Sequence, residues 1–273
     1  MSNANLDVIG PWSEIKLEIF RDYSNAYTTI LANQTAIKRY IYIDGYAGAG
    51  KHISKMTGEV VPGSPLIALD SAQGFDEFHF IDLNPERSLR LAELSQGRSN
   101  VFVHHGDCNQ VLLNEVFPRC RYEDFARGLC VLDPYALNVD WRILEAAGRM
   151  KSVDLFYNFM IMDANMNVFL WNPDKVADSQ IARMNAVWGD ESWRNAAYKK
   201  VKTLFGEEEE KATNGRVAKA FQKRLREVAG FKYVPDPIEM RNSTGATVYY
   251  LDFASNNPTG NKIASHIFNQ HRR

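Results

Sequence analysis

The sequence predicts an α/β fold built on a doubly wound parallel sheet. Three observations predict it: five strand-then-helix units follow one another, four of the expected strands end at an aspartate, and a glycine cluster follows the first strand. Those four aspartates are Asp44, Asp82, Asp107 and Asp133. Because ligands bind beyond the carboxyl ends of the strands in such sheets, we expect the functional site at this edge.

Size and composition fit a globular protein with a substantial core: 273 residues, 45% hydrophobic and 24% charged. The net charge of −1 excludes a uniformly basic nucleic-acid-binding protein. Cys108, Cys120 and Cys130 match no zinc-ligand spacing, so we expect three buried thiols, no metal site and a reducing, cytoplasmic setting. The sequence has neither a membrane-length apolar run nor a secretory leader pattern.

The first elements alternate clearly between helix and strand. Apolar residues recur every three or four positions from Trp12 to about Ala36, which predicts a helix with Ser13 as a possible N-cap. The run RYIYID predicts a strand, and GYAGAG a tight loop. Residues 51–63 show no period, and Ser64 as N-cap with Pro65 in the first turn predicts the next helix.

The following units are more regular. We expect strands at 78–82, 100–107, 128–135 and 152–159. Helices are expected after Asn84 and Pro85, near CNQVLLNEVF and near VDWRILEAAGRM.

The last third divides into two parts. We expect an inserted, mostly helical subdomain at 160–230. The chain then returns to the core begun by 1–159: residues 231–273 are expected to add an antiparallel hairpin, which turns at Asn242–Gly245, and a helix. Residues 192–232 contain eleven Lys and Arg against five Glu. This basic segment is either a solvated face or a platform for nucleic acid or a protein partner.

Three kinds of nucleotide site compete for the glycine loop. Gly45, Gly50 and Lys51 match the start of a P-loop, but His52 stands where a Ser or Thr should follow and no helix is expected there. A dinucleotide site requires G-x-G-x-x-G, whereas Gly45, Gly48 and Gly50 are spaced G-x-x-G-x-G. Both interpretations are therefore weak.

The third interpretation is an S-adenosylmethionine site. Asp44 suits the ammonium of the methionine moiety, and Asp82, at the next strand end, suits the two ribose hydroxyls. Asp107 is placed to meet the exocyclic amine of adenine. The expected cofactor-binding residues are Asp44, Gly45, Tyr46, Gly48, Gly50, Asp82, Leu83, Asp107 and Cys108.

Several motifs carry a family resemblance: WSEIKLEIFRDY, YIDGYAGAG, GSPLIAL, FHFIDLNPER, HHGDCN, VLDPYALNVDW and FASNNPTGNKI. In them the chain resembles the three-Cys-motif partner (TcmP) family, bacterial and phage-associated methyltransferase-like proteins. The resemblance spans most of the chain outside 160–230. It implies a Rossmann-like class I methyltransferase fold, S-adenosylmethionine as cofactor, and a separate three-Cys-motif protein as partner. Tyr46 and Ala49 depart from the family's usual Phe and Pro.

The acceptor side is expected after the fourth strand. Asp133-Pro134-Tyr135 is one proline short of the (Asp/Asn)-Pro-Pro-(Tyr/Phe) motif of amino-methyltransferases. By that analogy Asp133 positions the acceptor N–H and Tyr135 walls the pocket, and these two are the expected catalytic residues. The alternative is that Asp133 and Pro134 only end a strand and turn the chain.

Other polar residues are weaker candidates. Lys16 either reaches a ligand carboxylate or lies on a solvated helix face, and His104 and His105 are more typical of core histidines. Asn158 and Asp163 lie near the same edge without an assigned role.

The main hypothesis is thus an S-adenosylmethionine-dependent methyltransferase acting on a nucleic-acid or protein amine. The alternative is a methyltransferase-fold partner or scaffold protein, and a lesser alternative is a P-loop-like nucleotide binder.

Overall fold

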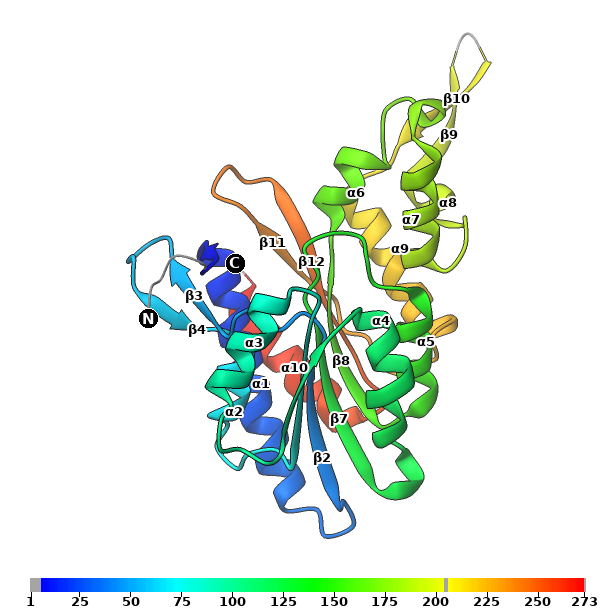
Figure 1. The fold of residues 1–273 in the computed structure, drawn as a ribbon. Coiled ribbons are helices and arrows are strands. Elements are labelled where there is room, and N and C mark those ends of the chain that lie inside the picture. The colour runs from blue at the N-terminus through cyan, green and yellow to red at the C-terminus, as the bar shows by residue number, and fades with distance from the viewer. Residues whose placement is uncertain (1–5, 204–205, 273) are drawn as a thin grey trace.

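A seven-stranded sheet forms the centre of the computed structural model, which describes residues 6–203 and 206–272 (Figure 1). The strand order is β11-β12-β8-β7-β2-β5-β6. The strands are β2 (Arg39–Asp44), β5 (Glu77–Asp82), β6 (Val101–His105), β7 (Ala126–Leu132), β8 (Val153–Phe159), β11 (Ile238–Arg241) and β12 (Thr247–Ala254).

The sheet is parallel from β6 to β8 and antiparallel beyond. β2 pairs in parallel with both β5 and β7, whereas β12 runs antiparallel to β8 and to β11. The hairpin turns at Asn242–Gly245, where the Gly245 N–H donates to the Asn242 carbonyl over 2.9 Å. The predicted doubly wound sheet with a terminal antiparallel hairpin is confirmed.

Helices cover both faces, and a separate hydrophobic cluster lies under each layer. Helices α1 (Pro11–Ala32), α2 (Ser64–Leu69), α3 (Pro85–Leu94) and α10 (Pro258–His271) contribute to one cluster. On the other face lie α4 (Cys108–Val111) and α5 (Trp141–Met150). Alternation along β2 explains the division, because Tyr42 joins the first cluster while Ile41 and Ile43 join the second.

Two expected helix caps are wrong. Helix α1 begins at Pro11 with Gly10 as N-cap, because the fixed φ of proline suits the first helical position; Ser13 therefore lies inside the helix. Helix α2 has Gly63 as N-cap, and Ser64 is its first residue. The Asn84 cap of α3 is confirmed, since its side chain accepts from the backbone N–H groups of Glu86 and Arg87.

The segment 51–63, expected to lack regular structure, contains a hairpin of β3 (Lys51–Ser54) and β4 (Val60–Pro62). β1 (Val8–Ile9) adds to β3 in parallel and completes a small sheet. The strands are too short for a clear period, and Gly58, with φ of +74°, allows the turn between them. This small sheet lies beside the start of α1, away from the inserted segment (Figure 1).

Residues 160–230 combine helices with a hairpin. The helices are α6 (Ile161–Asn167), α7 (Asp178–Trp188), α8 (Trp193–Ala197) and α9 (Asn214–Glu227), and the unpredicted antiparallel hairpin is β9 (Tyr198–Thr203) with β10 (Gly206–Lys211). Phe221 of α9 stacks on Phe159 of β8 with ring centroids 4.5 Å apart. The segment is therefore anchored to the end of the sheet. No helix among the described residues is long and apolar enough to cross a membrane.

Candidate functional site

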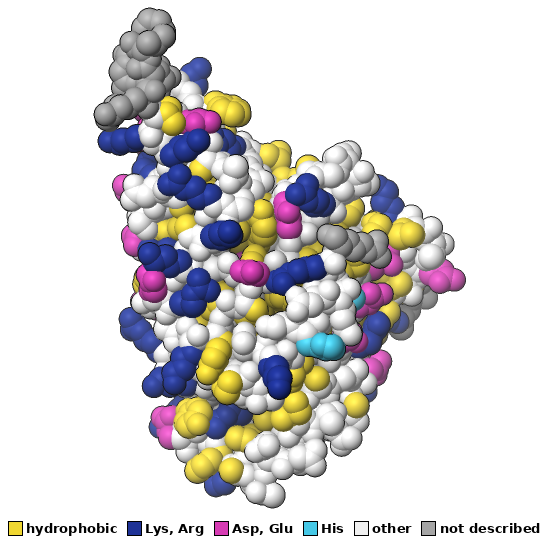
Figure 2. Space-filling model, turned by 180° about the vertical axis from the view of Figure 1, so that it is seen from behind, with side chains coloured by type: hydrophobic (Ala, Val, Ile, Leu, Met, Phe, Trp, Pro, Cys, Tyr) yellow, Lys and Arg dark blue, Asp and Glu magenta, His cyan; other side chains and the backbone are white. Residues whose placement is uncertain are grey.

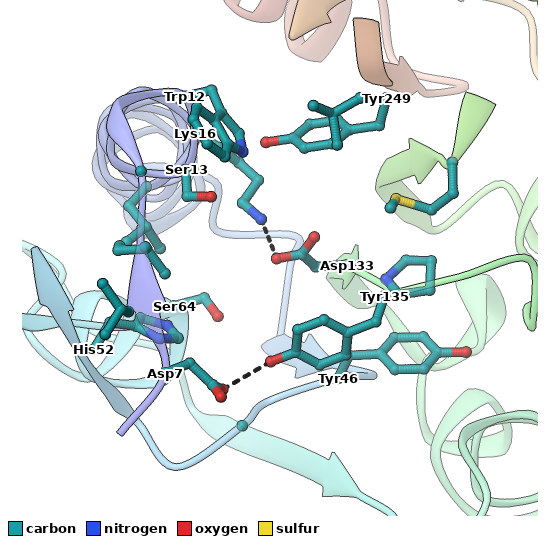
Figure 3. A pocket seen from close by; sticks show the side chains of 18 of the residues that line it. Asp7, Trp12, Ser13, Lys16, Tyr46, His52, Ser64, Asp133, Tyr135 and Tyr249 are labelled. Atoms are coloured by element: carbon teal, nitrogen blue, oxygen red, sulfur yellow. Dashed lines mark hydrogen bonds and ion pairs between the residues drawn. The ribbon is translucent and has the colours of Figure 1, made fainter. Parts of the chain in front are cut away.

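Two adjoining cavities open at the carboxyl ends of the parallel strands. One, of about 450 Å³, is lined by Asp82 and is called here the Asp82 cavity; the other, of about 350 Å³, is lined by Asp133 and is called the Asp133 cavity. Tyr46 and Tyr135 line both cavities. The two tyrosines therefore form the boundary between them, and Figure 3 shows both from the side of the Asp133 cavity.

The predicted ends of β2, β5 and β6 meet at the Asp82 cavity. Its lining residues are Gly45, Tyr46, Asp82, Leu83, Asn84, Pro85, Arg87, Gly106, Asp107, Cys108, Tyr135 and Asn138. Asp82 is fixed through both carboxylate oxygens, which accept from the Gly48 N–H over 2.9 Å and from the Asn84 N–H over 2.8 Å. Each oxygen keeps further acceptor capacity, so Asp82 is able to receive hydroxyl donors from a ligand.

The glycine loop is a tight turn, as its sequence predicts. A Cβ at Gly45 would lie 2.7 Å from both the Cys108 Sγ and a methyl of Leu132, so the backbone approaches α4 and β7 too closely for a side chain. Gly48 and Gly50 adopt φ values of +64° and +77°, where other residues are strained. The chain then enters strand β3 at Lys51 instead of a helix. The loop therefore lacks the P-loop geometry, and the P-loop interpretation is wrong.

The remaining wall of the Asp82 cavity is partly apolar. Leu83 is 69% exposed, which presents its side chain to the cavity beside Asp82. Asp107 caps α4 by accepting the Gln110 N–H through one oxygen, Oδ1. Burial raises the pKa of the Cys108 thiol, which is therefore a neutral part of the wall. These are the features of a site for a flat, partly polar ligand.

Asp44 lies elsewhere than expected. It is completely buried and lines neither cavity, and its Oδ1 accepts the Tyr46 N–H over 3.3 Å. Burial raises its pKa to about 7, partly offset by a hydrogen bond from Ser64. The expected direct contact with a ligand ammonium is not supported by this geometry, which gives Asp44 a role in holding the glycine loop.

The Asp133 cavity is assembled from segments far apart in the sequence. Its walls come from β1, the start of α1, β3, the glycine loop, the end of β7 and β12. Its lining residues are Asp7, Val8, Ile9, Gly10, Trp12, Ser13, Lys16, Leu17, Tyr46, Ala47, Gly48, His52, Ser64, Asp133, Pro134, Tyr135, Met160, Val248 and Tyr249.

Asp133 is held from two sides. Lys16 Nζ donates to its Oδ2 and Asn158 Nδ2 donates to its Oδ1 (Figure 3 shows the Lys16 contact). Lys16 is buried, with its ammonium 5.4 Å from the centroid of the Tyr249 ring, so its alternative placement on a solvated helix face is wrong. A sequence signal existed: Lys16 shares the apolar stripe of α1 with Ile19 and Tyr23.

Polar atoms that lack partners gather around Asp133. Among the described residues, the Tyr249 hydroxyl, the His52 Nδ1 and the Asn158 Oδ1 are buried without a hydrogen bond. Tyr249 and His52 line the Asp133 cavity. Burial lowers the pKa of His52, which favours its neutral form. Because a buried polar atom without a partner costs about 1–3 kcal/mol, such a group is expected where a ligand supplies the missing bond.

Tyr135 is fixed by an arrangement that the sequence did not suggest. Its hydroxyl donates to Asp7 over 3.0 Å, and Arg87 donates to the same carboxylate over 2.9 Å. The Arg87 guanidinium also lies 5.5 Å from the Tyr135 ring centroid. Asp7 stands 128 positions before Tyr135, and no local pattern marks it.

Several candidates have structural roles outside both cavities. His104 contacts His79 at 3.0 Å, and His105 contacts the Leu83 carbonyl at 3.2 Å. Asp163 pairs with Arg183 and accepts the Leu137 N–H. Cys120 and Cys130 are free and buried in the core, and Cys108, also free and buried, lines the Asp82 cavity. Within the part of the chain that the structure describes, no group of three or more His, Cys, Asp or Glu is arranged to hold a metal ion.

Strand order defines the fold. The parallel core with an antiparallel β12 between β8 and β11 is a Rossmann-like fold of the class I methyltransferase type. Protein LPL1258 of Legionella pneumophila, a DUF519 protein, is similar, with a TM-score of 0.53 and 13% identity over 94% of this chain and 92% of that one.

Other similar structures are the DszA carbon methyltransferase and the fibrillarin of Aeropyrum pernix with bound S-adenosylmethionine. The first has a TM-score of 0.41 and 12% identity over 83% of this chain and 50% of that one. The second has a TM-score of 0.35 and 10% identity over 86% of this chain and 76% of that one. No protein-family model and no curated protein matches the sequence.

Proposed function

We propose that the protein is an S-adenosylmethionine-dependent methyltransferase that acts on an amino group of a nucleic acid or protein. One observation carries the proposal: two cavities adjoin at the carboxyl ends of the strands and share Tyr46 and Tyr135. One has a carboxylate with free acceptor capacity beside a glycine loop, and the other has a carboxylate fixed by two donors. Such a pair suits a cofactor and an acceptor that meet at a shared boundary.

The Asp82 cavity would hold the adenosine part of the cofactor. Asp82 would accept hydrogen bonds from the ribose hydroxyls, Asp107 would accept one from the exocyclic amine of adenine, and Leu83 and Cys108 would contact the base. The loop from Gly45 to Gly50 leads the methionine part past Tyr46 toward the Asp133 cavity. The cofactor would supply an electrophilic methyl group on a sulfonium.

The Asp133 cavity would hold the acceptor. Lys16 and Asn158 fix the Asp133 carboxylate, which accepts an acceptor N–H and directs the nitrogen lone pair toward the boundary. Tyr135 provides a flat wall for a ring-bearing acceptor. The bound cofactor would supply the methyl group at this boundary and leave as S-adenosylhomocysteine, and the proton lost by the acceptor nitrogen would pass to the Asp133 carboxylate or to solvent. Catalysis is mostly orientation for in-line transfer.

Calorimetric titration with S-adenosylhomocysteine tests the cofactor assignment. We expect micromolar binding by the wild type, no measurable binding by Asp82→Ala, and wild-type binding by Asp22→Ala, which changes an exposed aspartate on α1. ATP with magnesium and NAD serve as competing ligands. Equal affinity in the wild type and Asp82→Ala, or preference for ATP or NAD, would contradict the proposal.

The family motifs support a second candidate function. A member of the three-Cys-motif partner family would act together with a separate three-Cys-motif protein, which requires a docking surface and tolerates an inactive site. Co-purification of a stable complex, with no methyl transfer to nucleic acid or protein, would favour this candidate. A chain that transfers methyl groups alone would exclude it.

A further inference from the structure

Helix α9 presents a basic face to solvent. Arg216, Lys219, Lys223 and Arg226 are all exposed and fall within a narrow sector of the helix, at intervals of three or four residues. The opposite side is buried through Val217, Ala218, Phe221, Gln222 and Leu225. At 1.5 Å per residue, the four cations extend over about 15 Å. Dark-blue side chains gather on the side of the molecule that carries the inserted segment (Figure 2).

Most of this charge is not compensated. Among the described residues, no ion pair involves Arg216, Lys219 or Arg226, and Lys223 has a 3.7 Å contact with the exposed Glu227. Arg216 and Arg226 donate to backbone carbonyls, which leaves their charge intact. Arg224 differs, since it pairs with Asp190 and packs on Trp141. The 192–232 segment therefore presents a row of four cations on one face of α9, three of them without an ion pair among the described residues.

The α9 face connects to the Asp133 cavity through α6. Met160 lines the cavity and directly precedes α6, and Asn165 of α6 donates to Asn214 at the start of α9 over 2.9 Å. Two apolar side chains in this part of the chain stand exposed: Met166 of α6 is 70% exposed, and Trp171, four residues after α6 ends, is 81% exposed. A tryptophan this exposed has unused ring faces on which bases can stack.

We propose that α6, Trp171 and the α9 face form a track for single-stranded nucleic acid whose target base enters the Asp133 cavity. Arginine and lysine on α9 contact the phosphates, and Trp171 stacks on a base near the cavity. A single strand is favoured over a duplex because its bases are free to stack and to enter a cavity. The identity of the reacting base rests on the proposed function, whereas binding to the track does not.

Fluorescence anisotropy with labelled single-stranded RNA and DNA, without cofactor, tests the track. Arg216→Glu with Lys219→Glu reverses two charges, and the first change places Glu three residues after the Thr213 cap, a favourable helix start. We expect affinity to fall about tenfold or more, and the salt dependence to fall by about 1.4 in log–log slope for two lost phosphate contacts. Arg21→Glu with Lys262→Glu, on α1 and α10, is the matched control and should bind like the wild type.

Trp171→Ala separates stacking from charge. We expect at least about fivefold weaker binding with an unchanged salt slope, and loss of the tryptophan quenching that nucleic acid produces in the wild type. Exposed Met166 can be changed to Ala as a milder comparison.

Three results would overturn the track: no binding by the wild type, equal weakening by the control pair, or equal competition by polyglutamate. Tighter binding of duplex DNA than of single strands would overturn the choice of occupant. Asp82→Ala keeps full nucleic-acid affinity if the track is correct, so loss of S-adenosylhomocysteine binding and loss of nucleic-acid binding report separately on the two proposals.

Discussion

The two cavities differ in how the chain builds them. The Asp82 cavity comes mainly from consecutive strand–loop–helix units, and its polar residues Asp82, Asn84 and Asp107 stand at a strand end or within two residues of one. The Asp133 cavity brings together Lys16 and Asp133, 117 positions apart, and also includes β12 near the C-terminal end of the fold. Local sequence thus determines the first cavity, whereas tertiary packing determines the second.

This difference suggests a division of roles. Local construction suits a constant ligand, because the sheet itself fixes the positions of the binding groups. Much of the wall of the Asp133 cavity comes from β1, α1, β3 and β12, outside the parallel strands of the central sheet. Their sequence can therefore change, and with it the acceptor, without disturbing the parallel sheet. Substitutions in one cavity should therefore change cofactor binding without changing acceptor use, or the reverse.

The largest expected effect comes from Asp133→Ala. Removing the carboxylate that orients the acceptor should lower methyl transfer about 10³-fold, within the range of general acid–base contributions, while S-adenosylhomocysteine affinity stays within about twofold. Asp133→Asn keeps an acceptor oxygen and should retain more activity. If Asp133→Ala binds the cofactor and still transfers methyl groups at the wild-type rate, Asp133 does not orient the acceptor.

Asp44→Asn tests the cofactor side through stability. The folded-state pKa of about 7 lies above the ordinary 3.8, so the native state holds the proton more tightly and stability falls as pH rises from about 4 to 7. Between pH 5 and pH 8 the wild type should lose about 3 kcal/mol at this site, and Asp44→Asn should not. Urea unfolding at both pH values measures this. Asp22→Asn is the control, and identical pH dependence in wild type and Asp44→Asn would contradict the assignment.

Lys16→Met tests whether the fixed carboxylate matters. The substitution keeps the apolar stem and removes the ammonium that holds Asp133, so turnover should fall about tenfold, a typical coupling for a close charged pair. In an Asp133→Asn background the same change should cost little more. Fully additive losses of activity would show that Lys16 acts independently of Asp133. Lys262→Met, which removes an exposed lysine on α10, is the matched control.

Leu83→Ala has the smallest expected effect. Loss of its contact with an adenine ring should weaken S-adenosylhomocysteine binding about threefold to tenfold, as expected for part of a leucine side chain. Leu89→Ala removes a similarly exposed leucine on α3 outside the cavity and should leave affinity unchanged. Equal effects of the two substitutions would place the base elsewhere.

The same contrast explains what could be predicted from sequence. The strand ends, the glycine loop and the Asn84 cap depend on neighbouring residues and are visible as local patterns. The start of α1 was misplaced because Pro11 dominates over Ser13, and β3 and β4 are too short to show a period.

The acceptor side could be predicted only in part. Asp133 and Tyr135 are visible as a motif, but Asp7 and Tyr249 carry no local signal because their partners, Tyr135 and Lys16, lie more than 100 positions away in the sequence. Lys16 had a signal in its place on an apolar stripe. The burial of Asp44 was not predictable, because a strand-end acid does not reveal whether its side chain faces a cavity or the core.

Transfer of a radiolabelled methyl group from S-adenosylmethionine tests the central claim most directly. Wild type and Asp133→Ala would be incubated with total RNA, DNA and protein as acceptors. The account predicts that the wild type labels at least one acceptor pool, with RNA or single-stranded DNA foremost, and that Asp133→Ala labels none while binding S-adenosylhomocysteine normally. Tight cofactor binding with no label in any pool, or equal labelling by both proteins, would contradict it.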